Sequence, residues 1–198
     1  ARIGDPGALP GLRTAAAAGG FDLREGPLVA LSRLGGDPER SVVAAARVKD
    51  CGVASAAASQ ACVAAQARSY AGMVARLEAA RACRGEVNCW TARLADPSAA
   101  VRDRAALEVG RAGGPPQAEA LAVAIVRSVE GDDDLAARYH AVLALGWIAR
   151  GAGLGAAGAG IADPLDRMIA SGKGRSLTAR VNEDALRLAA KLPRAPRG

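Results

Sequence analysis

Apolar residues recur every three or four positions through most of the chain, a spacing that places them on one face of a helix. Clear examples are Leu121, Ile125 and Val129, and later Leu177, Val181, Leu188 and Leu192. Runs that alternate between apolar and polar residues, which are typical of strands, do not occur. The pattern therefore predicts an all-α protein. Its expected helices cover residues 28–34, 41–48, 53–82, 87–95, 98–112, 117–129, 135–150, 164–170 and 177–192.

One segment of this pattern occurs twice. Residues 101–110 read VRDRAALEVG and residues 137–146 read ARYHAVLALG, so that Arg102 aligns with Arg138 and Gly110 with Gly146. An aspartate precedes each copy by the same interval, at Asp96 and at Asp132. Units that return after 30 to 50 residues are typical of stacked helical hairpins. The sequence therefore predicts a short array of such hairpins.

Glycine and proline divide the chain into three expected regions. Residues 1–27 are rich in both and predict an irregular lead-in, residues 28–192 the helical array, and residues 193–198 a disordered tail. Within the array, residues 151–160 read as a low-complexity linker. The linker contains a literal G-x-G-x-x-G at residues 153–158. No strand precedes it, so we interpret it as a chance match rather than a cofactor site.

The order of features around the two copies resembles the HEAT repeat. Each copy has a helix, an aspartate-containing turn, and a second helix that opens with an arginine and ends in Leu-Gly or Val-Gly. The resemblance is good over residues 90–110 and 121–146, and partial over 27–48 and 161–192. It implies a short right-handed α-α superhelix of HEAT-like hairpins with divergent end repeats. It also implies binding of protein partners along a concave face, and it admits a protein associated with modification of other proteins.

The repeated aspartates and arginines are the first candidate site residues. Asp96 and Asp132 are expected to cap helix starts. In neighbouring copies they are expected to meet Arg102 and Arg138, forming a charge-assisted ladder across the repeat interface.

Four cysteines, Cys51, Cys62, Cys83 and Cys89, form a second candidate group. An even, clustered set suggests disulfides and an oxidising compartment, whereas the lack of Cys-x-x-Cys argues against zinc. Three pairings exist, and we favour Cys51–Cys62 and Cys83–Cys89 because each closes a short segment containing a glycine. The first pair requires a helix break near residue 52, since a continuous helix would separate its ends by about 16 Å. The alternative is four buried thiols in a cytosolic protein.

The charge leaves two classes of partner open. The net charge is +6 and the aromatic content is 3%. The positive charge is almost all arginine and is interleaved with acids, which favours solvated helix faces and protein partners over nucleic acid. The alternative is a nucleic-acid-binding groove that contains Trp90 or Trp147 and is lined by arginines, namely Arg102, Arg104, Arg138, Arg150 and Arg180.

Catalytic chemistry is not indicated. His140, the one histidine, aligns with Arg104 and is expected on the repeat surface, and no serine or cysteine has an activating partner. No metal or cofactor site is predicted, and residues 132–134 are interpreted as a solvated capping turn rather than a calcium loop. The most apolar stretch, residues 141–149, is too short to span a bilayer. Because the chain begins at Ala1, we expect either a mature exported protein or an excised domain.

Together these features predict a non-enzymatic interaction scaffold without cofactors. We expect it to be a subunit of a larger extracytoplasmic assembly, periplasmic or secreted, in a bacterium.

Overall fold

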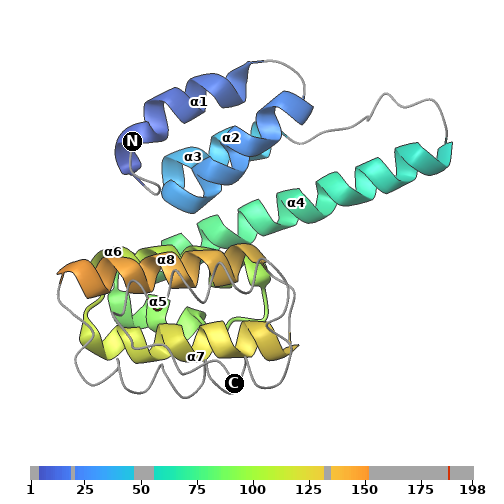
Figure 1. The fold of residues 1–198 in the computed structure, drawn as a ribbon. Helices are drawn as coiled ribbons and strands as arrows, with labels where there is room; N and C mark the ends of the chain where they lie inside the picture. The colour runs from blue at the N-terminus through green and yellow to red at the C-terminus, as the bar shows by residue number, and fades with distance from the viewer. Residues whose placement is uncertain (1–4, 19–20, 47–55, 132–134, 152–186, 188–198) are drawn as a thin grey trace. The chain divides into compact units, whose positions relative to one another are not determined.

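The computed structural model describes residues 5–18, 21–46, 56–131, 135–151 and 187. All regular structure within these ranges is helical, which confirms the all-α prediction. The chain divides into two compact units, Ala1–Arg84 and Gly85–Gly198. Unit 1 contains the 3-10 helix η1 (Pro6–Ala8), α1 (Leu9–Ala17), α2 (Phe21–Leu34), α3 (Asp37–Ala45) and α4 (Ala56–Cys83). Unit 2 contains α5 (Val87–Arg93), α6 (Ala99–Ala112), α7 (Pro115–Gly131) and α8 (Leu135–Gly151) (Figure 1).

Unit 1 is built around α2, which packs against α1, α3 and α4. Its core consists of small and aliphatic side chains contributed by all four helices. These are Ala16, Leu28, Leu31, Val43, Ala46, Met73 and Leu77, with Leu9, Leu12, Val29, Val42 and Tyr70 packed at the edge. The apolar stripe that predicts a helix over residues 28–34 is therefore the face that α2 buries.

A buried carboxylate organises the turn between α2 and α3. The backbone N–H of Gly36 donates to Glu39 Oε2 at 2.7 Å, and Arg13 of α1 donates through Nε to Oε1 at 2.9 Å. A Cβ at Gly35 would overlap the Glu39 side chain, so the turn needs glycine there. Burial by itself raises the pKa of the Glu39 carboxyl, but the Arg13 and Gly36 hydrogen bonds outweigh it and hold that pKa below its usual value.

The described residues of unit 2 form two helical hairpins, α5–α6 and α7–α8. The second helices of the hairpins, α6 and α8, lie side by side, and the first helices, α5 and α7, also contact each other (Figure 1). The hairpins share one apolar core. Its buried members include Trp90, Leu94, Val101, Leu107, Val109, Leu121, Ile125, Leu145 and Ile148. Trp90 and Leu94 both face inward, as their four-residue spacing predicts.

Small residues bring α6 and α8 close together. A Cβ added at Gly110 would lie 2.6 Å from Ala144 Cβ and 2.9 Å from Trp147 Cε3. Further toward the start of both helices, the side chain of Asp103 contacts that of His140. Since the two contacts follow the same order along both helices, α6 and α8 run in the same direction, as the second helices of successive repeats do.

The predicted boundaries hold for most helices and fail at the N-terminus. The irregular lead-in expected over residues 1–27 is wrong, because α1 and the first half of α2 occupy it. Pro10 lies in the first turn of α1, where its missing N–H costs no hydrogen bond, and the alanine run continues that helix. The range predicted for the array, residues 28–192, includes parts of both units, and the array itself stays a prediction. Several predicted segments lie outside the described residues, except for Gly151 and residue 187. They are the linker at 151–160, the helices expected over 164–170 and 177–192, and the tail at 193–198.

None of the described helices combines the length and the apolar content that crossing a membrane requires.

Candidate binding pocket

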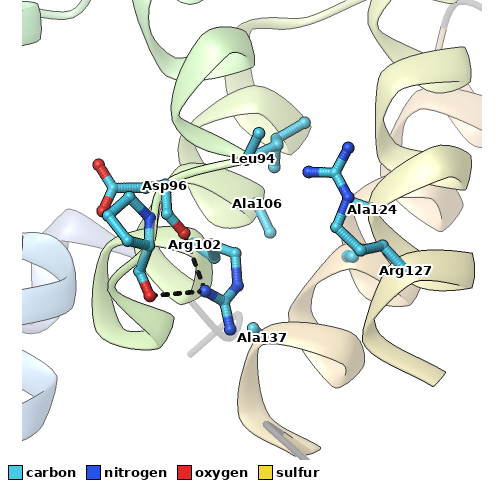
Figure 2. Close-up of a pocket in the computed structure, with 10 residues that line it drawn as sticks. Leu94, Asp96, Arg102, Ala106, Ala124, Arg127 and Ala137 are labelled. Atoms are coloured by element: carbon cyan, nitrogen blue, oxygen red, sulfur yellow. Dashed lines mark hydrogen bonds between the residues drawn. The ribbon is translucent and has the colours of Figure 1, made fainter. Parts of the chain in front are cut away.

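A pocket of about 300 Å³ opens between the two hairpins of unit 2. Its lining comes from the turn after α5 and from α6, α7 and α8 (Figure 2). Most of that lining is small or apolar: Leu94, Ala95, Pro97, Ala106, Ala124, Ala137 and Ala141. The charged residues are Asp96, Arg102 and Arg127. The pocket exists because four alanines from three helices leave space where larger side chains would meet.

Arg102 is fixed on one side of the pocket by main-chain carbonyl groups. Its Nη1 donates to Asp96 O at 2.8 Å and to Pro97 O at 3.0 Å (Figure 2). The turn that presents these carbonyls is itself held by the Asp96 carboxylate, which accepts from the backbone N–H of Ser98 at 2.9 Å and from Arg93 at 2.8 Å. The Asp96 charge is therefore paired with Arg93, and two of the groups that hold Arg102 are main-chain carbonyl oxygens.

Arg127 supplies the second positive charge. It extends from α7 toward Leu94, with Ala106 between it and Arg102 (Figure 2). Its side chain is exposed, and within the described part of the chain it forms no ion pair. A guanidinium group in this state retains its hydrogen-bond donors for a ligand.

Two guanidinium groups on an apolar pocket suit an anionic ligand. Arginine binds carboxylates and phosphates through charge-assisted hydrogen bonds, which strengthen when neighbouring apolar walls exclude water. The pocket lining named above contains no serine, cysteine, histidine or lysine, and its one carboxylate, that of Asp96, is paired with Arg93. The arrangement is suited to binding.

The predicted ladder residues are only partly placed by the described residues. Asp96 does not cap α6: the N-cap residue is Ser98, which makes no side-chain cap hydrogen bond, and the Asp96 carboxylate accepts from the backbone N–H of Ser98 within the preceding turn. Arg102 does reach Asp96, but through the main-chain carbonyl of its own turn. Arg138 is buried on α8, and Asp132 lies outside the described residues. The ladder across the repeat interface stays a prediction.

The cysteine prediction is confirmed for one pair. Cys83 and Cys89 lie within disulfide distance, and both are disulfide-bonded. Between them Arg84 and Gly85 adopt positive φ values of 47° and 84°, which end α4 and turn the chain toward α5. Cys62 is also disulfide-bonded, whereas Cys51, its predicted partner, lies outside the described residues.

The expectation that His140 lies on the repeat surface is wrong. His140 is buried, and its Nδ1 contacts Oδ1 of Asp103, which is completely buried. The contact escapes an alignment of the copies because position 104, not position 103, is the equivalent of 140. The sequence places Asp103 seven residues before Gly110, on the same face of α6, but that spacing does not identify its partner on α8.

The arginines of the expected nucleic-acid groove do not form one surface. Arg104 is buried, with its guanidinium carbon 5.5 Å from the centroid of the Trp90 ring and hydrogen bonds to Glu108. Arg138 is also buried. Arg150 is exposed at the end of α8, and Arg180 lies outside the described residues.

No family model, curated protein or solved structure matches this chain. The geometry of the pocket is therefore the guide to what this chain binds. Among the described residues, no group of three histidine, cysteine or acidic side chains could hold a metal ion.

Proposed function

We propose that this chain is a non-enzymatic, HEAT-like interaction module, and that the pocket of unit 2 receives an acidic side chain from a protein partner. One observation carries the proposal: Arg102 and Arg127 line a single pocket whose other residues are mainly alanine, and whose one carboxylate, Asp96, is paired with Arg93. An Asp or Glu side chain would place its carboxylate between the two guanidinium groups and its methylene groups against the alanines. We therefore propose that the chain is a subunit of a larger assembly.

Two features favour a protein ligand over a nucleic acid. Nucleic-acid grooves need several solvent-accessible cations that follow a phosphate backbone, and aromatic faces for unpaired bases. Here Arg104, Arg138 and Trp90 are all buried. A pocket of about 300 Å³ also matches one or two amino-acid side chains better than a strand of nucleotides.

The disulfides support an extracytoplasmic location for this module. Disulfides persist in oxidising compartments such as the bacterial periplasm and are rare in the cytosol. The bonded state of Cys62, Cys83 and Cys89 fits that environment. We therefore propose an exported bacterial protein.

Selection of peptides from a phage-displayed random library tests this function. Peptides that contain Asp or Glu should be enriched on the wild-type protein and lost on the Arg127→Ala variant. Arg150→Ala, which removes an exposed arginine outside the pocket, is the matched control and should retain them. Equal enrichment on all three proteins, or none on the wild type, would overturn the proposal. So would tight binding of labelled single-stranded DNA that is unaffected by Arg127→Ala.

A further inference from the structure

A second hollow of about 370 Å³ lies beside the first, over the contact between α5 and α7. Its lining is mainly apolar: Leu94, Ala95, Pro116, Ala120, Val123 and Ala124, with Thr91, Glu119 and Arg127 as the polar members. Val123 is 53% exposed, although it is a large aliphatic residue next to other apolar side chains. Covering such a side chain stabilises a complex, since burial of apolar surface contributes about 25 cal/mol per Å².

The two hollows share a wall. Leu94, Ala95, Ala124 and Arg127 line both of them. We call the combined depression the α5–α7 groove, defined by the residues that line the two hollows. Arginine is suited to such a wall, because its aliphatic stem packs against apolar surface while its guanidinium carries the charge.

The charges differ between the two ends of this groove. The first hollow has Arg102 and Arg127 beside Asp96, whose carboxylate is paired with Arg93, whereas the second has Glu119 and no arginine other than Arg127. A second acidic group in the second hollow would meet the Glu119 carboxylate at short range, which disfavours it. The second hollow instead offers Val123, Pro116 and Ala120 to an apolar group.

We propose that the α5–α7 groove binds an extended peptide segment of the pattern acid–x–aliphatic. The acidic side chain occupies the first hollow, and the aliphatic side chain occupies the second, against Val123. The inference rests on the proposed function and adds the chemistry of the next ligand residue. In an extended segment, side chains at positions i and i+2 project from the same face about 7 Å apart, which suits two adjacent hollows divided by one layer of side chains.

The two ends of the groove can be tested separately. Arg127→Ala removes the charge of the first hollow, and Val123→Ser removes the apolar contact of the second. Both side chains are exposed, so neither change should alter the thermal unfolding midpoint appreciably. Ala124→Leu inserts a larger side chain into the wall common to both hollows and should block the whole groove.

The probe is a set of fluorescein-labelled Gly/Ser peptides in which one Glu and one Leu are placed at every spacing and in both orders, read by fluorescence anisotropy. Affinity should peak with one residue between Glu and Leu. Replacing that Glu by Gln should weaken wild-type binding about tenfold, as expected for loss of a charge-assisted hydrogen bond. Replacing Leu by Ser should weaken it about fivefold, because less apolar surface is buried. The weakening caused by Gln in place of Glu should be absent in the Arg127→Ala protein, and the weakening caused by Ser in place of Leu should be absent in the Val123→Ser protein.

The outcomes separate the inference from the proposed function. Binding that depends on Glu and Arg127 but not on Leu or Val123 overturns the inference and leaves the acidic pocket standing. Binding that depends on Leu alone overturns both. Equal affinity at every spacing overturns the extended arrangement, and binding by none of the peptides overturns the inference. Unchanged affinity in Ala124→Leu shows that the ligand lies elsewhere and overturns both.

Discussion

The side chains of Asp103 in α6 and His140 in α8 contact each other between the two hairpins of unit 2. The two residues are 37 positions apart in the sequence, one more than the length of the repeat. Nδ1 of the imidazole faces Oδ1 of the carboxylate, and both side chains are buried. A polar pair at such a place must remain matched, because each member would otherwise be a buried polar group without this partner.

Removing one member of this pair should destabilise unit 2 strongly. We expect Asp103→Ala or His140→Ala to lower the free energy of unfolding by about 1 to 3 kcal/mol, the range found when a buried polar group loses a hydrogen-bond partner. The double variant should cost less than the sum of the two single changes. Urea unfolding measures all three, and Arg150→Ala serves as the exposed control on α8, with an effect within about 0.5 kcal/mol. Strict additivity would contradict the coupling.

Gly110→Ala should be destabilising, although alanine is the better helix former. The added Cβ would lie 2.6 Å from Ala144 Cβ and 2.7 Å from Ala144 Cα, so the two helices would have to move apart. We expect a loss of about 1 to 3 kcal/mol in unfolding free energy.

The control for this change is Gly26→Ala in α2, since nothing lies within 4 Å of a Cβ there. That change should stabilise the protein by up to about 1 kcal/mol through helix propensity alone. A gain in stability for both variants would show that the contact between α6 and α8 is looser than described.

Glu39 should make the stability of unit 1 depend on acidic pH. Its pKa in the folded protein is lowered from 4.5, so the ionised carboxylate stabilises the fold above that value. The contribution is lost as the pH falls through the lower, folded-state pKa. The difference in urea midpoint between wild type and Glu39→Gln should therefore be largest near neutral pH and shrink on acidification. A difference that is constant with pH would contradict this.

A second variant isolates the role of the arginine. Arg13→Ala removes the ion pair and leaves the burial of Glu39, so the pKa of Glu39 should rise relative to wild type. A titration of the Glu39 side chain followed by NMR measures this directly. An unchanged pKa would assign the lowering to the backbone hydrogen bonds of Gly36 and Glu39.

The cysteines should be unreactive until they are reduced. We expect no alkylation adduct on the native protein by mass spectrometry, and four after reduction and unfolding, one for each cysteine. Replacing Cys83 and Cys89 together by Ala should lower the free energy of unfolding by about 2 kcal/mol, the value for closing such a short loop. Four adducts without reductant would contradict both the bonding and the extracytoplasmic proposal.

Features that depend on local sequence could be predicted. The bounds of α6 and α8 follow from the repeated segment, and the Cys83–Cys89 pair follows from the short glycine-containing interval between them. The lead-in was mispredicted because its many glycines and prolines obscured the helix that its leucines and alanines form in α1. The residue composition of a segment does not separate the residues that break a helix from those that form one.

Features that depend on residues far apart could not be predicted. The pocket of unit 2 is a space left by alanines on α6, α7 and α8, and no local pattern records an unfilled volume. Arg127 was not singled out because nothing in its own helix distinguishes it from a solvated surface arginine. The Asp103–His140 contact requires knowledge of how far α8 is shifted along α6, which the repeat alignment alone misses by one residue.

The turn between α2 and α3 has a consequence for the history of this chain. Glu39 fills the space that a side chain at Gly35 would need, and it accepts from Arg13 of another helix. A relative that acquires any side chain at position 35 must therefore have a shorter residue at position 39. An arginine at position 13 would then lose its hydrogen bond to the carboxylate of residue 39. We expect these three positions to change together during divergence, so that their covariation would identify true relatives even where overall identity has faded.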